Sequence, residues 1–122
     1  MSLYQDLILD HYRNPRNAGT LPHPTGSADA INLSCGDKLH MDIALKNDKI
    51  LDIRFSGSGC AISLAAASLL TEHVKGKTAH EALGLEPKHI LEILGITLST
   101  NRLKCGLLSL ETLKKALAIN TK

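Results

Sequence analysis

The sequence predicts an α+β domain, with antiparallel strands in its first half and amphipathic helices around them. Two runs of alternating apolar and polar residues, 39–45 and 50–55, predict a β-hairpin with one buried face. Apolar residues at helical spacing before and after the hairpin predict helices at both ends of the chain. The 122 residues, 43% of them hydrophobic, suit one core, and we expect a single domain over residues 1–122.

The first helix is predicted over residues 2–13. Ser2, with Gln5 three residues later, has the spacing of a capping box. Pro, Gly, Asn and Thr dominate residues 14–27, and this composition predicts a loop. Residues 28–33 then form a short predicted strand.

The hairpin positions two cysteines. Asn47-Asp48 has the chemistry of a two-residue turn, and the second strand is expected to bury Leu51 together with Ile53 and Phe55. The two strands are antiparallel and similar in length, so their outer ends lie side by side. Cys35 and Cys60 are therefore expected close together although 25 positions separate them.

Four more helices follow, and their ends are recognisable. Small residues fill the helix predicted over 60–74, which favours close packing on the sheet. Thr78 and Glu81 form a capping box that opens a short helix. Pro87 suits the first position of the next helix, and Asn101 is expected to cap the last one.

Composition excludes some classes of partner and compartment. The net charge is +2, from 14 basic and 12 acidic residues, which is too even to predict a nucleic-acid or membrane-surface partner. No apolar run reaches spanning length and no signal peptide is recognisable, so we expect a cytoplasmic protein. Three cysteines, an odd number, favour metal or thiol chemistry over a disulfide framework.

Cys60 stands where a glycine-rich turn leads from a strand into a helix. The unpaired amides of a helix start carry partial positive charge, which favours the thiolate. Cys60 is therefore interpreted as a reactive or metal-binding cysteine; the alternative is a small buried apolar side chain. Cys105 is expected near another helix start, in the first or second turn of the last helix.

The third cysteine comes with a carboxylate. In Cys35-Gly36-Asp37 the glycine allows the thiol and the carboxyl to face one point. Three thiolates and a carboxylate would suit zinc or the iron of a cluster. The chain has no C-x-x-C pair, so three unrelated buried cysteines stay an alternative. No histidine lies at ligand spacing from a cysteine, and His40 is expected to point away from the buried face of its strand.

The chain resembles the U-type iron–sulfur cluster assembly family, which comprises IscU, SufU and the N-terminal domain of NifU. The resemblance rests on the stretches Tyr4–Asn17, Ser34–Asp37, Phe55–Ser63, Thr71-Glu72 with Val74–Lys77, and Arg102–Cys105. It implies a three-stranded antiparallel sheet packed against helices on one side, with a metal or cluster site at one exposed end. Its ligands would be Cys35, Asp37, Cys60 and Cys105.

Three features distinguish the chain from individual branches of that family. IscU-type members have a histidine directly before the third cysteine, whereas this chain has Lys104. In this respect the chain resembles SufU. Only 45 positions separate Cys60 from Cys105, which leaves no room for the insertion of SufU-type members. The Leu-Pro-Pro-Val-Lys chaperone-recognition motif of IscU is absent, and residues 96–101 stand in its region. The chain thus combines a SufU-like ligand set with an IscU-like length.

The resemblance implies a scaffold protein without an enzymatic activity of its own. This scaffold would receive sulfur from a cysteine desulfurase, bind iron and pass a transient [2Fe–2S] cluster to acceptor proteins. The sulfur acceptor would be Cys105, with Cys35 as second choice. One alternative is a zinc-bound sulfurtransferase that stimulates the desulfurase, and another is a structural zinc domain. Lys104 is either a charge that keeps neighbouring thiols ionised or an ordinary surface lysine.

Overall fold

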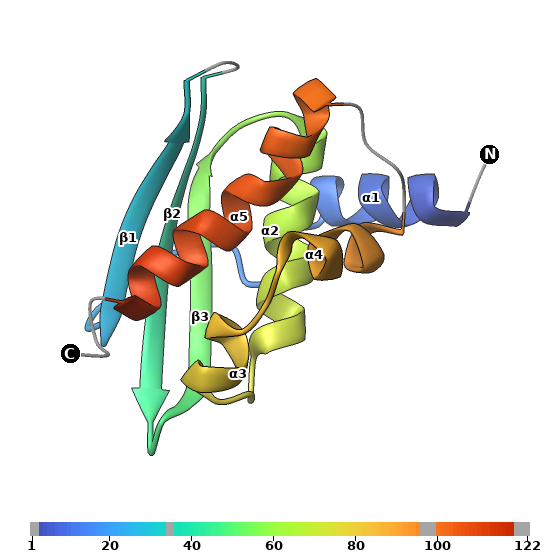
Figure 1. Cartoon of the computed structure of the whole chain (residues 1–122). Helices are drawn as coiled ribbons and strands as arrows, with labels where there is room; N and C mark the ends of the chain where they lie inside the picture. The colour runs from blue at the N-terminus through green and yellow to red at the C-terminus, as the bar shows by residue number, and fades with distance from the viewer. Residues whose placement is uncertain (1–2, 34–35, 96–99, 119–122) are drawn as a thin grey trace.

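The computed structural model describes the backbone of residues 3–33, 36–95 and 100–118, and the side chains of residues 5–33, 36–95 and 102–118. The chain forms five helices and three strands within these ranges (Figure 1). In chain order they are α1 (Leu3–Arg13), β1 (Gly26–Asn32), β2 (Asp37–Lys46), β3 (Lys49–Ser58), α2 (Ala61–Val74), α3 (Ala79–Leu83), α4 (Pro87–Leu94) and α5 (Thr100–Ala118).

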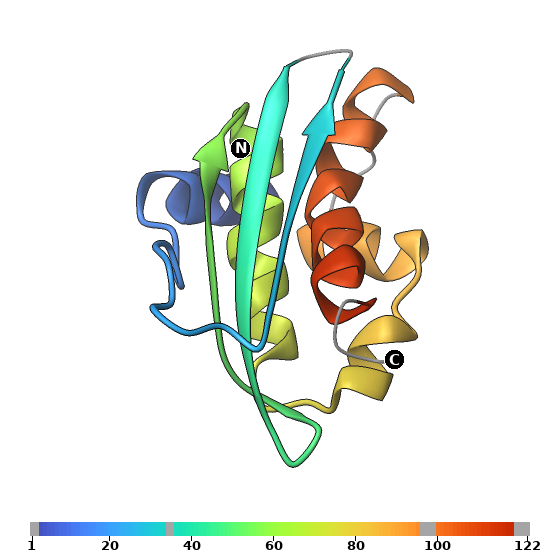
Figure 2. The same cartoon turned by 90° about the vertical axis from the view of Figure 1, so that its left-hand side faces the viewer.

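The three strands form one antiparallel sheet in the order β1-β2-β3. The helices lie on one face of this sheet and leave the other face to the viewer of Figure 2. Helix α2 packs against β3, α5 packs against β1 and β2, and α1 packs on the far side of α2. The predicted α+β class, with a three-stranded antiparallel sheet against helices, is confirmed.

The predicted hairpin forms with its turn at Asn47 and Asp48. Both residues have positive φ, 52° and 67°. This is the backbone of a type I′ turn, whose twist matches that of the strands it joins. Lys46 pairs with Lys49 directly beside the turn.

The prediction for Leu51 is wrong: its side chain is 62% exposed, whereas that of Ile50 is fully buried. The cause is a register shift at Ala44/Leu45. Leu45 pairs with Ile50 and Ala44 pairs with Asp52, so Leu51 is an extra residue without a partner on β2. A bulge of this kind turns a side chain to the other face of the sheet.

Most predicted helix ends are found. Thr78 and Glu81 form a reciprocal capping box at the start of α3, and Pro87 is the first residue of α4. The prediction that Asn101 caps the last helix is wrong, because α5 already begins at Thr100. The predicted capping box at Ser2 lies outside the described residues.

The topology gathers four element ends at one end of the molecule. The start of β2, the end of β3 and the N-terminal ends of α2 and α5 all lie there, opposite the β2–β3 turn (Figure 1). No helix among the described residues is long and apolar enough to cross a membrane.

Candidate metal centre

The hairpin brings Asp37 beside Cys60. Lys38 of β2 pairs with Ser58 of β3, so the residues just beyond this pair are neighbours. A Cβ atom on Gly59 would lie only 3.0 Å from Cγ of Asp37. Glycine at this position therefore lets the carboxyl group lie directly against the turn that leads into α2.

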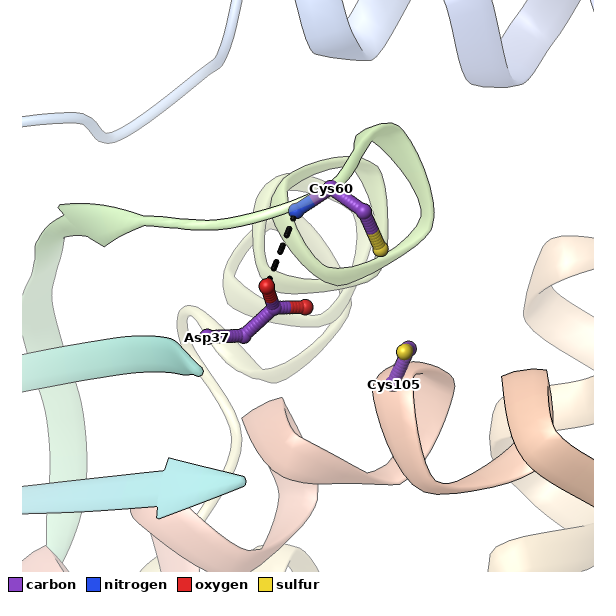
Figure 3. Close-up of side chains that lie close together, drawn as sticks. All are labelled: Asp37, Cys60 and Cys105. Atoms are coloured by element: carbon purple, nitrogen blue, oxygen red, sulfur yellow. Dashed lines mark hydrogen bonds between the residues drawn. The ribbon is translucent and has the colours of Figure 1, made fainter. Parts of the chain in front are cut away.

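Cys60 is the N-cap residue of α2, and its thiol is half-buried. Its side chain makes no capping hydrogen bond to the helix. Instead its backbone N–H donates to Oδ1 of Asp37 at 3.3 Å (Figure 3). The carboxylate of Asp37 in β2 thus accepts a hydrogen bond from an amide at the start of α2 that has no partner within the helix. A negative charge at the N-terminal end of a helix is stabilised by the partial positive charge of these amides.

Cys105 completes the described part of the site from the opposite side. It lies in the second turn of α5, as predicted, and is buried. Figure 3 shows its sulfur facing the space beside Asp37 and Cys60. The ligand atoms of these three residues all lie within 4.8 Å of one another.

Two thiols and one carboxylate this close together form a donor set that fits zinc or the iron of a cluster, since both accept mixed sulfur and oxygen ligands. Cys60 and Cys105 are not joined by a disulfide that would compete with a metal. Among the described residues, this is the only group of three or more such side chains with this geometry.

The predicted fourth ligand, Cys35, lies outside the described residues. The residue that follows it is described. Gly36 has φ of 76°, and its N–H donates to the carbonyl of Asn32 at 2.7 Å. Gly36 therefore has the left-handed backbone that glycine adopts easily. Its predicted role, to let the thiol of Cys35 and the carboxyl of Asp37 face one point, stays a prediction.

Sequence reasoning missed Ser63, which is fully buried in the first turn of α2. Its hydroxyl donates to Oδ2 of Asp37 at 2.5 Å and lies 3.2 Å from the carbonyl oxygen of Cys105. The Oγ atom is also 3.6 Å from Sγ of Cys60. The available signal was spacing, because a residue three positions after Cys60 shares its helix face.

Asn32 was also missed. This buried residue ends β1, and its Nδ2 atom lies 4.0 Å from Sγ of Cys105. An outer hydrogen-bond donor of this kind helps to orient a metal-ligating side chain. No local pattern in the sequence indicates this contact, because β1 and α5 meet only in the folded chain.

Lys104 precedes Cys105 and is exposed. It lines a groove of about 370 Å³ whose walls come from the end of β1 and from α5. Leu33, 91% exposed, belongs to the same groove. Through Lys104, which directly precedes Cys105, the groove adjoins the site. Lys104 gives it a positive charge, and Leu33 gives it apolar surface.

Two histidines have structural partners away from the cysteines. His11 is buried, with Nδ1 at 2.7 Å from Oγ of Ser68. His40 lies off the core, as predicted, between the carboxylates of Asp29 at 2.9 Å and Asp42 at 2.7 Å. Burial disfavours the charged form of His40, but these carboxylates outweigh it and raise its pKa above the ordinary value.

Comparison with known proteins gives one consistent family. Residues 3–121 match the family model described as the NifU-like N terminal domain. The iron–sulfur cluster assembly scaffold protein IscU of Aquifex aeolicus is 42% identical over 116 residues, which cover 93% of this chain and 73% of that protein. The zinc-dependent sulfurtransferase SufU of Bacillus subtilis is 34% identical over 134 residues, covering 96% of this chain and 90% of that protein.

A solved structure shares the fold over nearly the whole chain. It is the crystal structure of FiSufU, a SUF-system protein of the thermophile Fervidobacterium islandicum AW-1. The TM-score is 0.82 at 27% sequence identity, and 96% of each chain is covered. The alignment with the Bacillus protein spans 134 positions, which is more than the 122 residues of this chain. In the comparison with FiSufU, by contrast, 96% of each chain is aligned, so the two chains are similar in length.

Proposed function

The chain belongs to the NifU-like N-terminal domain family, and from this membership we propose that it is a scaffold for iron–sulfur cluster assembly. It would receive sulfur from a cysteine desulfurase, bind iron, and transfer a [2Fe–2S] cluster to acceptor proteins. The observation that carries the proposal is the convergence of Asp37, Cys60 and Cys105 within 4.8 Å at one end of the fold. The proposed ligands are these three residues and Cys35.

Sulfur transfer would begin at a thiolate of this chain. The thiolate attacks the outer sulfur of a persulfide on the desulfurase, a new S–S bond forms, and the desulfurase cysteine leaves as a thiolate. No net oxidation takes place in this step. We propose Cys105 as the acceptor because the side-chain amide of Asn32 is directed at its sulfur, and Cys35 as the second choice.

The cluster is the cargo of this reaction. Each sulfur received at the persulfide level needs two electrons to become sulfide, and an external thiol reductant can supply them. The thiolates then bind the iron of the growing cluster, while Asp37 offers a harder and more exchangeable oxygen ligand. We propose that a thiolate of the acceptor protein displaces this weaker ligand first when the cluster is transferred.

A zinc-dependent sulfurtransferase is the second candidate function. It is favoured by the similarity to SufU of Bacillus subtilis and by Lys104 beside Cys105. When bound, zinc would be held by Cys35, Asp37, Cys60 and Cys105, and its charge would keep the thiols ionised. The length of the chain favours the scaffold, because the Bacillus protein contains additional residues within the aligned region that this chain lacks.

Two further properties belong to this proposal. We propose that residues 1–122 form a single domain, which the family match over residues 3–121 supports. We also propose that the protein acts in the cytoplasm with a desulfurase and cluster acceptors as partners. The odd number of cysteines supports a reducing compartment.

Persulfide trapping tests the sulfur step. The protein is incubated with a cysteine desulfurase and cysteine, alkylated, digested and analysed by mass spectrometry. We expect one added sulfur on the peptide that contains Cys105, and its loss in Cys105→Ser. The matched control is Cys60→Ser, which removes a neighbouring thiol and should keep the added sulfur. Labelling that is absent in wild type would contradict both sulfur-transfer functions.

A further inference from the structure

Ser63 connects all three elements that carry the described ligands. It belongs to α2, which starts at the Cys60 N-cap, and its hydroxyl contacts Asp37 of β2 and the backbone carbonyl of Cys105 in α5. The side chain is fully buried, and it lies one turn from Cys60 on the same helix face.

At the start of α2, a carboxylate from another segment takes the place of a capping box. In an ordinary capping box, the N-cap and N3 residues of one helix satisfy each other. Here Ser63 is the N3 residue, but the N-cap Cys60 makes no side-chain cap. Asp37, from a strand, receives both hydrogen bonds, Oδ1 from the amide of Cys60 and Oδ2 from the hydroxyl of Ser63. The carboxylate is therefore fixed at two points by α2.

The same hydroxyl has a second acceptor. Its single hydrogen is donated to Asp37, at 2.5 Å, whereas the carbonyl of Cys105 at 3.2 Å is the alternative acceptor. Both acceptors belong to residues of the proposed ligand set, on different elements. Removing the hydroxyl would leave the buried Asp37 carboxyl with one less donor and would loosen the start of α2 from α5.

We propose that Ser63 is a positioning residue that holds the ligand set in its binding geometry before a metal arrives. The proposal rests on the metal site of the proposed function, and it concerns metal affinity rather than sulfur chemistry. Outer hydrogen-bond partners of metal ligands commonly contribute about 10- to 100-fold in affinity. Ser63→Ala is accordingly expected to weaken Zn²⁺ or Co²⁺ binding by about tenfold or more.

Ser68→Ala is the matched control. Ser68 is also fully buried in α2, but its hydroxyl contacts Nδ1 of His11 and the backbone N–H of Arg16, on the side of α1. The two variants each lose one buried hydroxyl from the same helix, so we expect a similar loss of stability in both. We expect Ser68→Ala to keep the metal affinity of wild type while melting at a temperature close to that of Ser63→Ala.

The test is a titration of each metal-free protein with Co²⁺ and with Zn²⁺ in the presence of a competing chelator. Cobalt binding is monitored by the thiolate-to-cobalt absorption bands, and zinc binding by the loss of these bands as zinc displaces cobalt. A double-mutant cycle with Asp37→Ala gives a second readout. If Ser63 acts through the carboxylate, Ser63→Ala should lose most of its effect on affinity in the Asp37→Ala background. If thermal melting shows that Ser63→Ala is unfolded, Ser63→Thr is titrated in its place. This variant keeps the hydroxyl and should bind cobalt like wild type.

Two results would overturn the inference. One is equal affinity in Ser63→Ala and Ser68→Ala, and the other is an unchanged effect of Ser63→Ala in the Asp37→Ala background. In both cases wild type still binds the metal, so the proposed function stands. Failure of wild type itself to bind cobalt or zinc would instead count against the metal site, and with it against the proposed function.

Discussion

Asp37 is the residue whose chemistry differs most from that of the other proposed ligands. It places a buried carboxylate beside two thiols, and both of its oxygens accept hydrogen bonds from the start of α2. Thiolates bind iron and zinc more strongly than a carboxylate does. In a site that must release its cargo, we interpret this oxygen ligand as the one that is exchanged.

Asp37→Ala is expected to slow the transfer of an assembled cluster to an apo acceptor protein. The physical reason is that an incoming acceptor thiolate loses the ligand that it would displace most easily. The measurement is the rate at which the acceptor's cluster absorption appears after mixing with loaded protein. The control variant is Asp29→Ala, which removes an exposed carboxylate of β1 that pairs with His40. Faster transfer by Asp37→Ala than by wild type would contradict this role.

At the scale of single elements, the attachment of α1 depends on a buried histidine. His11 of α1 contacts Ser68 of α2, and the backbone N–H of Arg16 donates to the same serine oxygen. Burial, together with the positive charge of Arg16, lowers the pKa of His11 below its ordinary value. The folded protein therefore holds this imidazole in its neutral form.

Stability is expected to fall as the pH drops below about 6.5, the ordinary pKa of histidine. A group whose pKa is lowered by folding contributes its full stability above the ordinary pKa, and this contribution is lost as the pH falls toward the folded pKa. We expect the contribution of His11 to the free energy of unfolding to decrease between pH 7 and pH 5.5. Urea denaturation at both pH values, in wild type and His11→Gln, measures it. An equal decrease in both proteins would assign the effect to other groups.

The β2–β3 turn offers a direct test of backbone conformation. Asp48 has φ of 67°, a value that glycine adopts without cost. Asp48→Gly is expected to stabilise the protein by about 0.5 to 1 kcal/mol, because Asn-Gly is the preferred sequence for this turn. Urea denaturation measures the change, and Lys49→Gly, at the next strand position, should destabilise instead. A less stable Asp48→Gly protein would mean that the aspartate side chain itself contributes to the turn.

The elements that could be predicted from the sequence are those set by local signals. The Asn47-Asp48 turn, the Thr78–Glu81 capping box and Pro87 act through neighbouring backbone, and each was found where predicted. Leu51 was placed on the wrong face because its orientation depends on a bulge in the pairing with β2. Strict alternation along one strand contains no information about such a shift.

The candidate site shows the same division. The hairpin argument placed the outer ends of the two strands side by side, and Asp37 and Cys60 meet there because antiparallel strands of similar length align their ends. The predicted closeness of Cys35 to Cys60 stays a prediction, since Cys35 lies outside the described residues. The contacts of Ser63 with Cys105 and of Asn32 with Cys105 could not be predicted in this way. They depend on where α5 packs against β1 and α2, which is decided by tertiary packing.

At the scale of the whole molecule, the three described ligands come from different elements and lie together at one end of the fold. Metal binding there would connect the start of β2, the N-terminal end of α2 and the second turn of α5. Because a metal ligand set of this kind exists only in the folded chain, binding free energy adds to folding free energy.

Zinc is therefore expected to raise the melting temperature of the metal-free protein, and a chelator is expected to lower it again. At a free zinc concentration of about 100 times the dissociation constant, the stabilisation is about 2.7 kcal/mol. Differential scanning calorimetry of apo and zinc-loaded protein measures it, with Cys60→Ser and Cys105→Ser as variants that should respond less. A melting temperature that zinc leaves unchanged would argue against a metal centre built from these elements.

The most direct test of the scaffold is its content of iron and acid-labile sulfide. The protein is incubated anaerobically with a cysteine desulfurase, cysteine, ferrous iron and a thiol reductant, then purified, and its absorption spectrum is recorded. The scaffold predicts iron and sulfide in about equal amounts. It also predicts thiolate-to-iron charge-transfer bands that disappear in Cys35→Ser and Cys105→Ser. A single tightly bound zinc without sulfide, together with faster desulfurase turnover, would contradict the scaffold and identify a sulfurtransferase.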